Sequence, residues 1–157
     1  MQLNNGVTRM NKQPDPTPAT WTIEVCKTRA GREPFTTFLN SLNPYQRAIA
    51  ATAIRTVLAT RGHAVCETEW GKPLGKGLYE FRVRRTLAAI CSEAGIDPPS
   101  GIPGGGRVLL RIFFVVYGDR IVLLLGGYNK GRDPSRFRQL REIRRARSIL
   151  KEFRQDQ

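Results

Sequence analysis

Groups that bind metals or form disulfides are scarce in this 157-residue chain. It holds three cysteines, Cys26, Cys66 and Cys91, without a CxxC pair, and one histidine, His63. A structural zinc site needs four closely grouped ligands, and a secreted disulfide scaffold needs more cysteines than this. The composition therefore predicts no metal site and no other cofactor, and it favours a reducing, cytoplasmic location.

Long apolar runs are also missing. No stretch reaches membrane-spanning length, and the N-terminus lacks the apolar core of a signal peptide. We therefore expect a soluble protein that does not contact membranes. Residues 1–20 hold three prolines and almost no large apolar side chain, so we expect a disordered tail followed by a single domain over 21–157.

Acidic residues are few relative to basic ones. The chain has 26 Lys and Arg against 13 Asp and Glu, a net charge of +13, and residues 72–157 alone hold 18 basic and 8 acidic side chains. Such an excess indicates a nucleic acid or an acidic protein as partner. A surface kept soluble by its charge is the alternative.

Local patterns predict an α+β fold. Alternation over 21–27 indicates a strand, and helical spacing over 34–42 and 45–60 indicates two helices divided at Asn43-Pro44. Three further strands are expected between Trp70 and Lys130, followed by an arginine-rich helix from Ser135. Helical spacing in that last helix predicts a buried stripe of Phe137, Leu140, Ile143, Ala146, Leu150 and Phe153. We expect the two helices to pack on one sheet face and to leave a concave opposite face.

Basic side chains are predicted to gather on that opposite face. Alternation places Glu80, Arg82 and Arg84 on one side of their strand, and it places Arg111 opposite an all-apolar face of the next. A charge among apolar neighbours needs a partner. Glu80 is one candidate partner, and a phosphate bound by the three arginines is the other.

Three other segments bear on function. Lys72 and Lys76 lie in a glycine-rich segment over 63–77 that we interpret as a loop, either close to a ligand or a plain surface turn. Residues 86–106 form a long insertion in which 87–94 has helical character. The arginines of the last helix either track phosphates or cover a solvated face.

Two blocks of sequence carry a family resemblance. The runs KPLGKGLYEFRVRR and LLRIFFVVYGDRIVLLLGGYNKGRDPS, with the helix opening RQLREIRRAR, resemble the RelE/HigB-like toxins. The similarity is greater to the phage-derived branch of the RelE/ParE superfamily, and it covers roughly 21–153 in element order. It implies an N-terminal helical hairpin packed on a curved, mainly antiparallel four-stranded sheet, plus a C-terminal basic helix.

The same resemblance implies the toxin of a type II toxin–antitoxin system. RelE and HigB relatives cut mRNA in the ribosomal A site without a metal, whereas ParE relatives poison DNA gyrase. The implied partners are mRNA, the ribosome and a cognate antitoxin, expected to be a helix-turn-helix protein from a neighbouring gene. A basic nucleic-acid-binding phage protein without toxicity is a third possibility.

Site residues follow from the matching positions. The resemblance implies a catalytic set of Arg82, Arg84, Arg111 and Lys130, of which Arg111 faces the scissile phosphate. We expect RNA contacts from Lys72, Lys76, Tyr128, Arg132, Arg136 and Arg141.

The chain departs from the family pattern at two places. Glu80 stands where some relatives carry lysine, and no tyrosine matches the one that some relatives use near the last helix, where Phe137 lies closest. The acid and base therefore stay open among Glu80, Lys76, Lys130 and Tyr128, since crowded positive charge lowers the pKa of a lysine.

Overall fold

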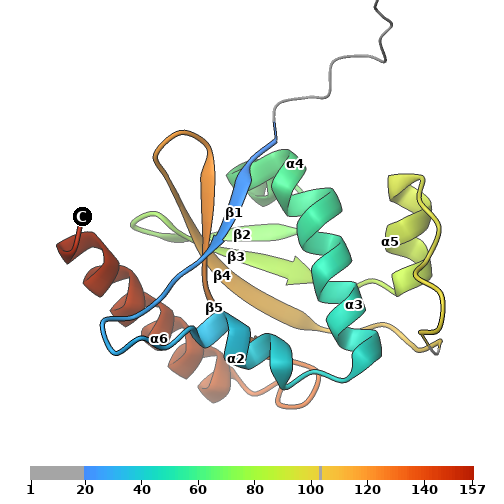
Figure 1. The fold of residues 1–157 in the computed structure, drawn as a ribbon. Helices are drawn as coiled ribbons and strands as arrows, with labels where there is room; N and C mark the ends of the chain where they lie inside the picture. The colour runs from blue at the N-terminus through green and yellow to red at the C-terminus, as the bar shows by residue number, and fades with distance from the viewer. Residues whose placement is uncertain (1–19, 103) are drawn as a thin grey trace, which may run out of the picture.

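A five-stranded mixed sheet forms the centre of the protein (Figure 1). The computed structural model describes residues 20–102 and 104–157, so all but Thr20 of the expected tail lies outside the described residues. The strand order is β1-β5-β4-β3-β2, with β1 parallel to β5 and every other pair antiparallel. The strands are β1 (Thr22–Val25), β2 (Gly71–Gly75), β3 (Leu78–Val83), β4 (Leu110–Tyr117) and β5 (Ile121–Asn129).

The expected α+β class is confirmed, but the expectation of four strands is wrong. The additional strand is β2, which lies in the segment interpreted as a loop because of its glycines and Pro73. Proline is tolerated in an edge strand because its missing N–H faces away from the sheet. A tight turn at Lys76 and Gly77, both with positive φ, then returns the chain into β3.

Three of the five helices in the described residues begin at a side-chain cap. The helices are α2 (Pro34–Asn40), α3 (Pro44–Ala53), α4 (Ala59–Arg61), α5 (Leu87–Ala94) and α6 (Arg136–Gln155). A π-helical turn (Ile54–Leu58) joins α3 to α4, and a 3₁₀ segment (Gly62–Glu67) leads into β2. Asn43 and Gln46 form a reciprocal capping box at α3, and the hydroxyls of Thr86 and Ser135 cap α5 and α6.

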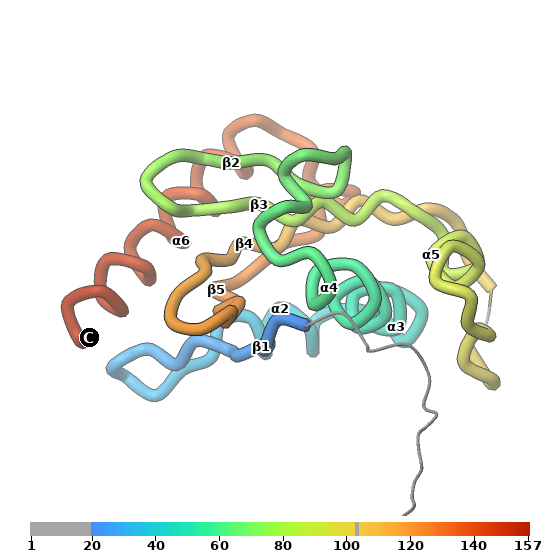
Figure 2. The backbone as a smooth tube through the Cα atoms, turned by 90° about the horizontal axis from the view of Figure 1, so that it is seen from above, coloured from blue at the N-terminus to red at the C-terminus, as the bar shows by residue number. Residues whose placement is uncertain are grey.

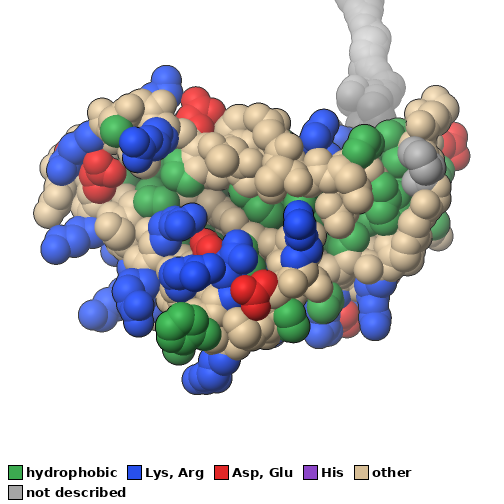
Figure 3. Space-filling view, turned by 90° about the horizontal axis from the view of Figure 1, so that it is seen from below, with side chains coloured by type: hydrophobic (Ala, Val, Ile, Leu, Met, Phe, Trp, Pro, Cys, Tyr) green, Lys and Arg blue, Asp and Glu red, His purple; other side chains and the backbone are tan. Residues whose placement is uncertain are grey.

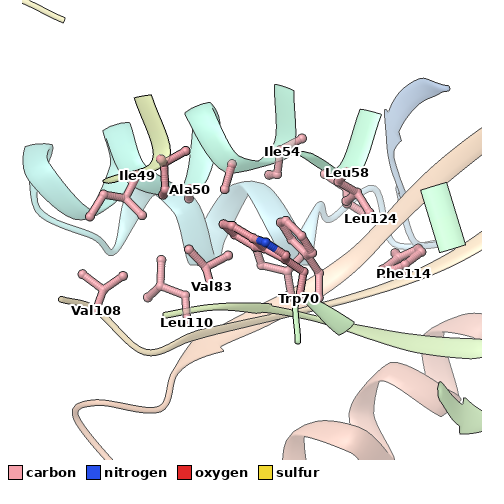
Figure 4. Close-up of a cluster of buried hydrophobic side chains, with 14 of the residues drawn as sticks. Ile49, Ala50, Ile54, Leu58, Trp70, Val83, Val108, Leu110, Phe114 and Leu124 are labelled. Atoms are coloured by element: carbon pink, nitrogen blue, oxygen red, sulfur yellow. The ribbon is translucent and has the colours of Figure 1, made fainter. Parts of the chain in front are cut away.

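Two apolar layers enclose the sheet. On one face, Val83, Leu110 and Phe114 pack against Ile49 and Leu58 (Figure 4). These two residues belong to the long helical run that α3, the π-helical turn and α4 form together. On the other face, α6 packs through Ala146, Ile149 and Leu150 onto Leu78, Phe113, Val115, Leu123 and Leu125 (Figure 2). The face expected to lie open is therefore covered in part by α6, and the arginines occupy what remains of it.

The buried stripe expected on α6 is confirmed only over its later part. Ala146 and Leu150 are buried and Ile143 and Phe153 pack against the same core, whereas Phe137 and Leu140 are 78% and 44% exposed. At about 100° per residue, Phe137 lies about 180° around the helix from the buried Ala146. Glu142 takes an inward position instead.

The 86–106 insertion is partly structured. Its helix α5 buries Leu87, Ile90 and Cys91 in the core beside α3. The hydroxyl of Tyr45 donates to the backbone carbonyls of Gly105 and Gly106, at 2.9 and 2.7 Å. The insertion is thus attached at both ends to the helical hairpin.

Candidate nucleic-acid site

Neighbouring strands align three polar side chains in one row of the sheet. Arg82 of β3 is paired in register with Arg111 of β4, which is paired with Tyr128 of β5. Residues opposite one another on adjacent strands project from the same face. Pairing therefore brings together side chains that lie 29 and 17 positions apart in the sequence.

One buried carboxylate lies between the two arginines. Glu80 Oε1 accepts from Arg82 Nε at 2.8 Å and from Arg111 Nη1 at 3.2 Å. The side chain of Glu80 is fully buried, that of Arg111 is 6% exposed, and that of Arg82 is 24% exposed. The carboxylate partner considered for Arg111 from the sequence is therefore present in the structure.

The pairing leaves capacity for a further acceptor. A guanidinium has five N–H donors, and Glu80 takes one from each arginine. Glu80 thus fixes the orientation of both forks without occupying them fully. Its other oxygen, Oε2, is buried and has no hydrogen-bond partner among the described residues.

Positive charge converges on this row. Burial lowers the pKa of Arg111, and the nearby Arg82 and Arg84 lower it further, against the opposing effect of Glu80. Burial likewise lowers the pKa of Lys130, and the surrounding Arg111, Arg82 and Lys72 act in the same direction. The four residues predicted to be catalytic therefore lie close enough to influence one another.

Arg84 marks the outer edge of this group. Its guanidinium lies 3.8 Å from Glu69, and both side chains are about half exposed. Arg85 is held by Glu69, by Glu93 and by the ring of Trp70. Arg84 is consequently the most exposed of the three predicted arginines and the most accessible to a ligand.

Tyr128 supports the site from beneath. Its ring is 1% exposed, stacks on Phe113 and lies under the guanidinium of Arg138, 5.3 Å from the ring centre. Its hydroxyl has no hydrogen-bond partner among the described residues, and burial raises its pKa. In this conformation RNA does not reach the ring, so direct contact stays a prediction.

The remaining predicted RNA contacts are spread over the surface. Lys72 of β2 is opposite Glu80 in register, so it lies on the same sheet face as the arginine row, and its charge acts on Lys130. Lys76 lies at the far end of the β2–β3 hairpin, and Arg132, Arg136 and Arg141 are exposed between β5 and the first half of α6. The structure thus groups Lys72 with the catalytic set and separates Lys76 from it.

A groove with a volume of about 950 Å³ adjoins the row. It lies between α2 and α6, with Tyr128 and Asn129 of β5 among its lining residues, and basic side chains surround the hollow seen from below (Figure 3). Arg138 lines it and is paired with Glu142 at 2.7 Å. The sequence analysis missed Arg138, although its four-residue spacing to Glu142 is typical of a helical ion pair.

The charged groups of the row have the chemistry of a phosphate-binding site. Among residues 20–102 and 104–157, no three side chains of His, Cys, Asp or Glu are grouped so that they could hold a metal ion. No helix in this part of the chain has the length and apolar character to cross a membrane. Two fixed guanidinium groups can bind a phosphodiester, and a nearby lysine of lowered pKa can exchange a proton with a hydroxyl group beside it.

No protein-family model matches the chain, and no curated protein sequence matches it either.

Proposed function

We propose that this protein is the toxin of a type II toxin–antitoxin system and an mRNA endonuclease that acts on the ribosome and so inhibits translation. The observation that carries the proposal is the Arg82–Glu80–Arg111 cluster beside Lys130. The cluster supplies two oriented guanidinium groups that are largely buried from solvent, where they interact more strongly with a charge than they would in water. The resemblance to RelE and HigB relatives supports the same activity.

The reaction uses the RNA's own 2′-hydroxyl. That oxygen attacks the adjacent phosphorus and loses its proton to a base, and the 5′-oxygen leaves and takes up a proton. Arg111 and Arg82 hold the non-bridging oxygens as their charge grows, which favours the transition state over the bound substrate. Loss of one such donor typically costs about 3–4 kcal/mol of transition-state stabilisation.

Lys130 is our candidate for the proton exchange. Its lowered pKa gives it a larger neutral fraction than an ordinary lysine, and the neutral amine accepts a proton. Glu80 then serves to hold both arginines rather than as the base. Since Glu80 is fully buried beneath them, the attacking hydroxyl has no direct path to it.

The experiment compares Arg111→Lys with the wild type in a cell-free translation system. Lysine keeps a positive charge for Glu80 but lacks the planar fork, so we expect ribosome-dependent mRNA cleavage to fall about 10²-fold or more. Arg61→Lys, an exposed residue on the helical run, is the matched control and should cut normally. Cleavage at the wild-type rate by a folded Arg111→Lys protein would refute the proposal.

One observation favours a second function, that of a ParE-like inhibitor of DNA gyrase. Arg82 and Arg111 already have a carboxylate partner, so the cluster is stable without any phosphate. A gyrase inhibitor would leave mRNA intact and block supercoiling by purified gyrase. Measuring both activities on one preparation distinguishes the two functions.

A further inference from the structure

A second basic hollow lies away from the arginine row, between the β2–β3 turn and the C-terminal half of α6. Its volume is about 340 Å³, and the turn lies beside α6 in both ribbon and tube views (Figures 1 and 2). The lining residues are Lys76, Arg147, Leu150, Lys151, Arg154 and Gln155. Four of these six are cations, and no acidic side chain is among them.

The four cations form no ion pair within the described part of the chain. Some surface arginines elsewhere are paired, as Arg29 is with Asp156 at 2.8 Å and Arg138 with Glu142. None of the four hollow residues forms an ion pair in residues 20–102 and 104–157. Cations held together without a counter-charge repel one another, and a bound anion removes that repulsion.

The β2–β3 turn places Lys76 beside this hollow. Lys76 has a φ of +56°, a conformation unusual for a residue with a side chain, and it stands between Gly75 and Gly77. Glycine would fit this position without strain, yet a lysine occupies it. A Cβ at Gly77 would lie 2.6 Å from Arg154 Nη2, so the glycine there lets Arg154 lie against the turn.

Helix α6 supplies the other cations in a fixed arrangement. Arg147, Lys151 and Arg154 follow one another at four and three positions, which places them on one face of the helix. Arg147 donates to the backbone carbonyls of Leu74 and Gly75 and so holds the turn against the helix. The hollow is therefore a joint feature of two elements that are distant in the sequence.

We propose that this hollow binds phosphate groups of the RNA backbone, as a second contact for a strand whose scissile phosphate lies at Arg111. The choice of RNA as ligand rests on the proposed function. Lys76 and Arg82 lie six residues apart along the hairpin, which corresponds to about 20 Å, within the span of a few nucleotides. Among the described residues, Leu150 is the only apolar one that lines the hollow, and a docked protein segment usually needs more apolar contact than that.

Binding is tested with the full chain and a fluorescent single-stranded RNA whose 2′-hydroxyls are methylated, so that it cannot be cut. Affinity is measured by anisotropy over a series of salt concentrations. For single strands, each phosphate contact contributes about 0.7 to the slope of log K against log salt. The double variant Lys151→Ala/Arg154→Ala should therefore make the slope shallower by about 1.4.

The matched control is Arg55→Ala/Arg61→Ala, which removes the same charge from exposed positions on the helical run that covers the other sheet face. We expect its slope to stay near that of the wild type. Lys76→Gly adds a test free of folding defects, because glycine suits the positive φ, and it should lower the slope by about 0.7 with an unchanged or higher melting temperature.

Three outcomes would overturn the proposal: equal slopes for the two double variants, no change in Lys151→Ala/Arg154→Ala, or competition by poly-glutamate as effective as that by RNA. The last result would assign the hollow to an acidic polypeptide. Failure of the proposed function is a separate result. A wild-type protein that cuts no mRNA but shows the slope difference would retain the phosphate site and lose the nuclease assignment.

Discussion

Glu80 is the residue on which the site depends most. It is fully buried and holds both Arg82 and Arg111 through one oxygen. Buried ion pairs add little stability relative to apolar side chains, but breaking one by removing a single partner is costly. The arginines are therefore both candidates for chemistry and parts of the folded structure, and variants at these positions need two measurements.

Arg111→Ala should lose stability as well as activity. The substitution leaves Glu80 buried with Arg82 alone, so we expect the free energy of unfolding to fall by about 3 kcal/mol. The double variant Glu80→Leu/Arg111→Leu should recover most of that loss while remaining inactive. Urea denaturation measures both effects, and an Arg111→Ala protein as stable as the wild type would contradict this account.

Lys130 should make both the free energy of unfolding and the cleavage rate change with pH in the alkaline range. Burial and the nearby Arg111 lower its pKa below 10.5, so the folded protein loses this proton before the unfolded chain does. The unfolded state then binds more protons, and the free energy of unfolding gains a contribution that rises with pH toward 10.5. Lys130→Met should lack this contribution.

A substitution at Lys72 tests whether nearby positive charge lowers the pKa of Lys130. Lys72 lowers the pKa of Lys130, so Lys72→Ala should raise that pKa and move the ascending limb of the cleavage profile, where the amine becomes neutral, to higher pH. Lys76→Ala, at the far end of the hairpin, serves as the comparison and should leave the position of that limb unchanged. An identical profile in the wild type and Lys72→Ala would count against Lys130 as the group that exchanges the proton.

At the scale of elements, helix α5 attaches the 86–106 insertion to the hydrophobic core. Ile90 is 1% exposed and belongs to the same core as the long helical run. Ile90→Ala should therefore lower the free energy of unfolding by about 2–4 kcal/mol. Ala88→Ser, on the exposed side of the same helix, should change it by less than about 0.5 kcal/mol.

Two deletions test the role of the whole insertion. If α5 contributes to the core, replacing all of 86–106 by a short turn destabilises the protein, whereas shortening only 95–101 is tolerated because its side chains are exposed. Thermal denaturation of the two deletions gives the comparison. Removal of the entire insertion without loss of stability would contradict a contribution of α5 to the core.

At the scale of the whole molecule, the net charge of +13 should govern association. Under the proposed function, we expect the product of the neighbouring gene to co-purify as an acidic antitoxin, with an association rate that falls steeply as salt increases. Titration in a series of salt concentrations measures the effect. Absence of binding at low salt would argue against a toxin–antitoxin pair.

The sequence by itself determined the local features. Alternation placed Arg82 and Arg111 on one face and their apolar neighbours on the other, because side-chain direction in a strand depends only on the backbone of that strand. The start of α2 at Pro34 and the N-caps Asn43 and Ser135 of α3 and α6 were equally predictable, because a first-turn proline or a cap acts within one turn. Glu80 was recognised as a partner because it lies two residues from Arg82.

Only the tertiary structure decided how those elements meet. The parallel pairing of β1 with β5, the edge strand β2 and the direction of the inward face of α6 all depend on contacts between distant segments. The hollow of Lys76 and Arg154 depends on the same kind of contact. Local periodicity carries no information about such pairings, because their free energy comes from apolar surface that is buried only when the whole chain has folded.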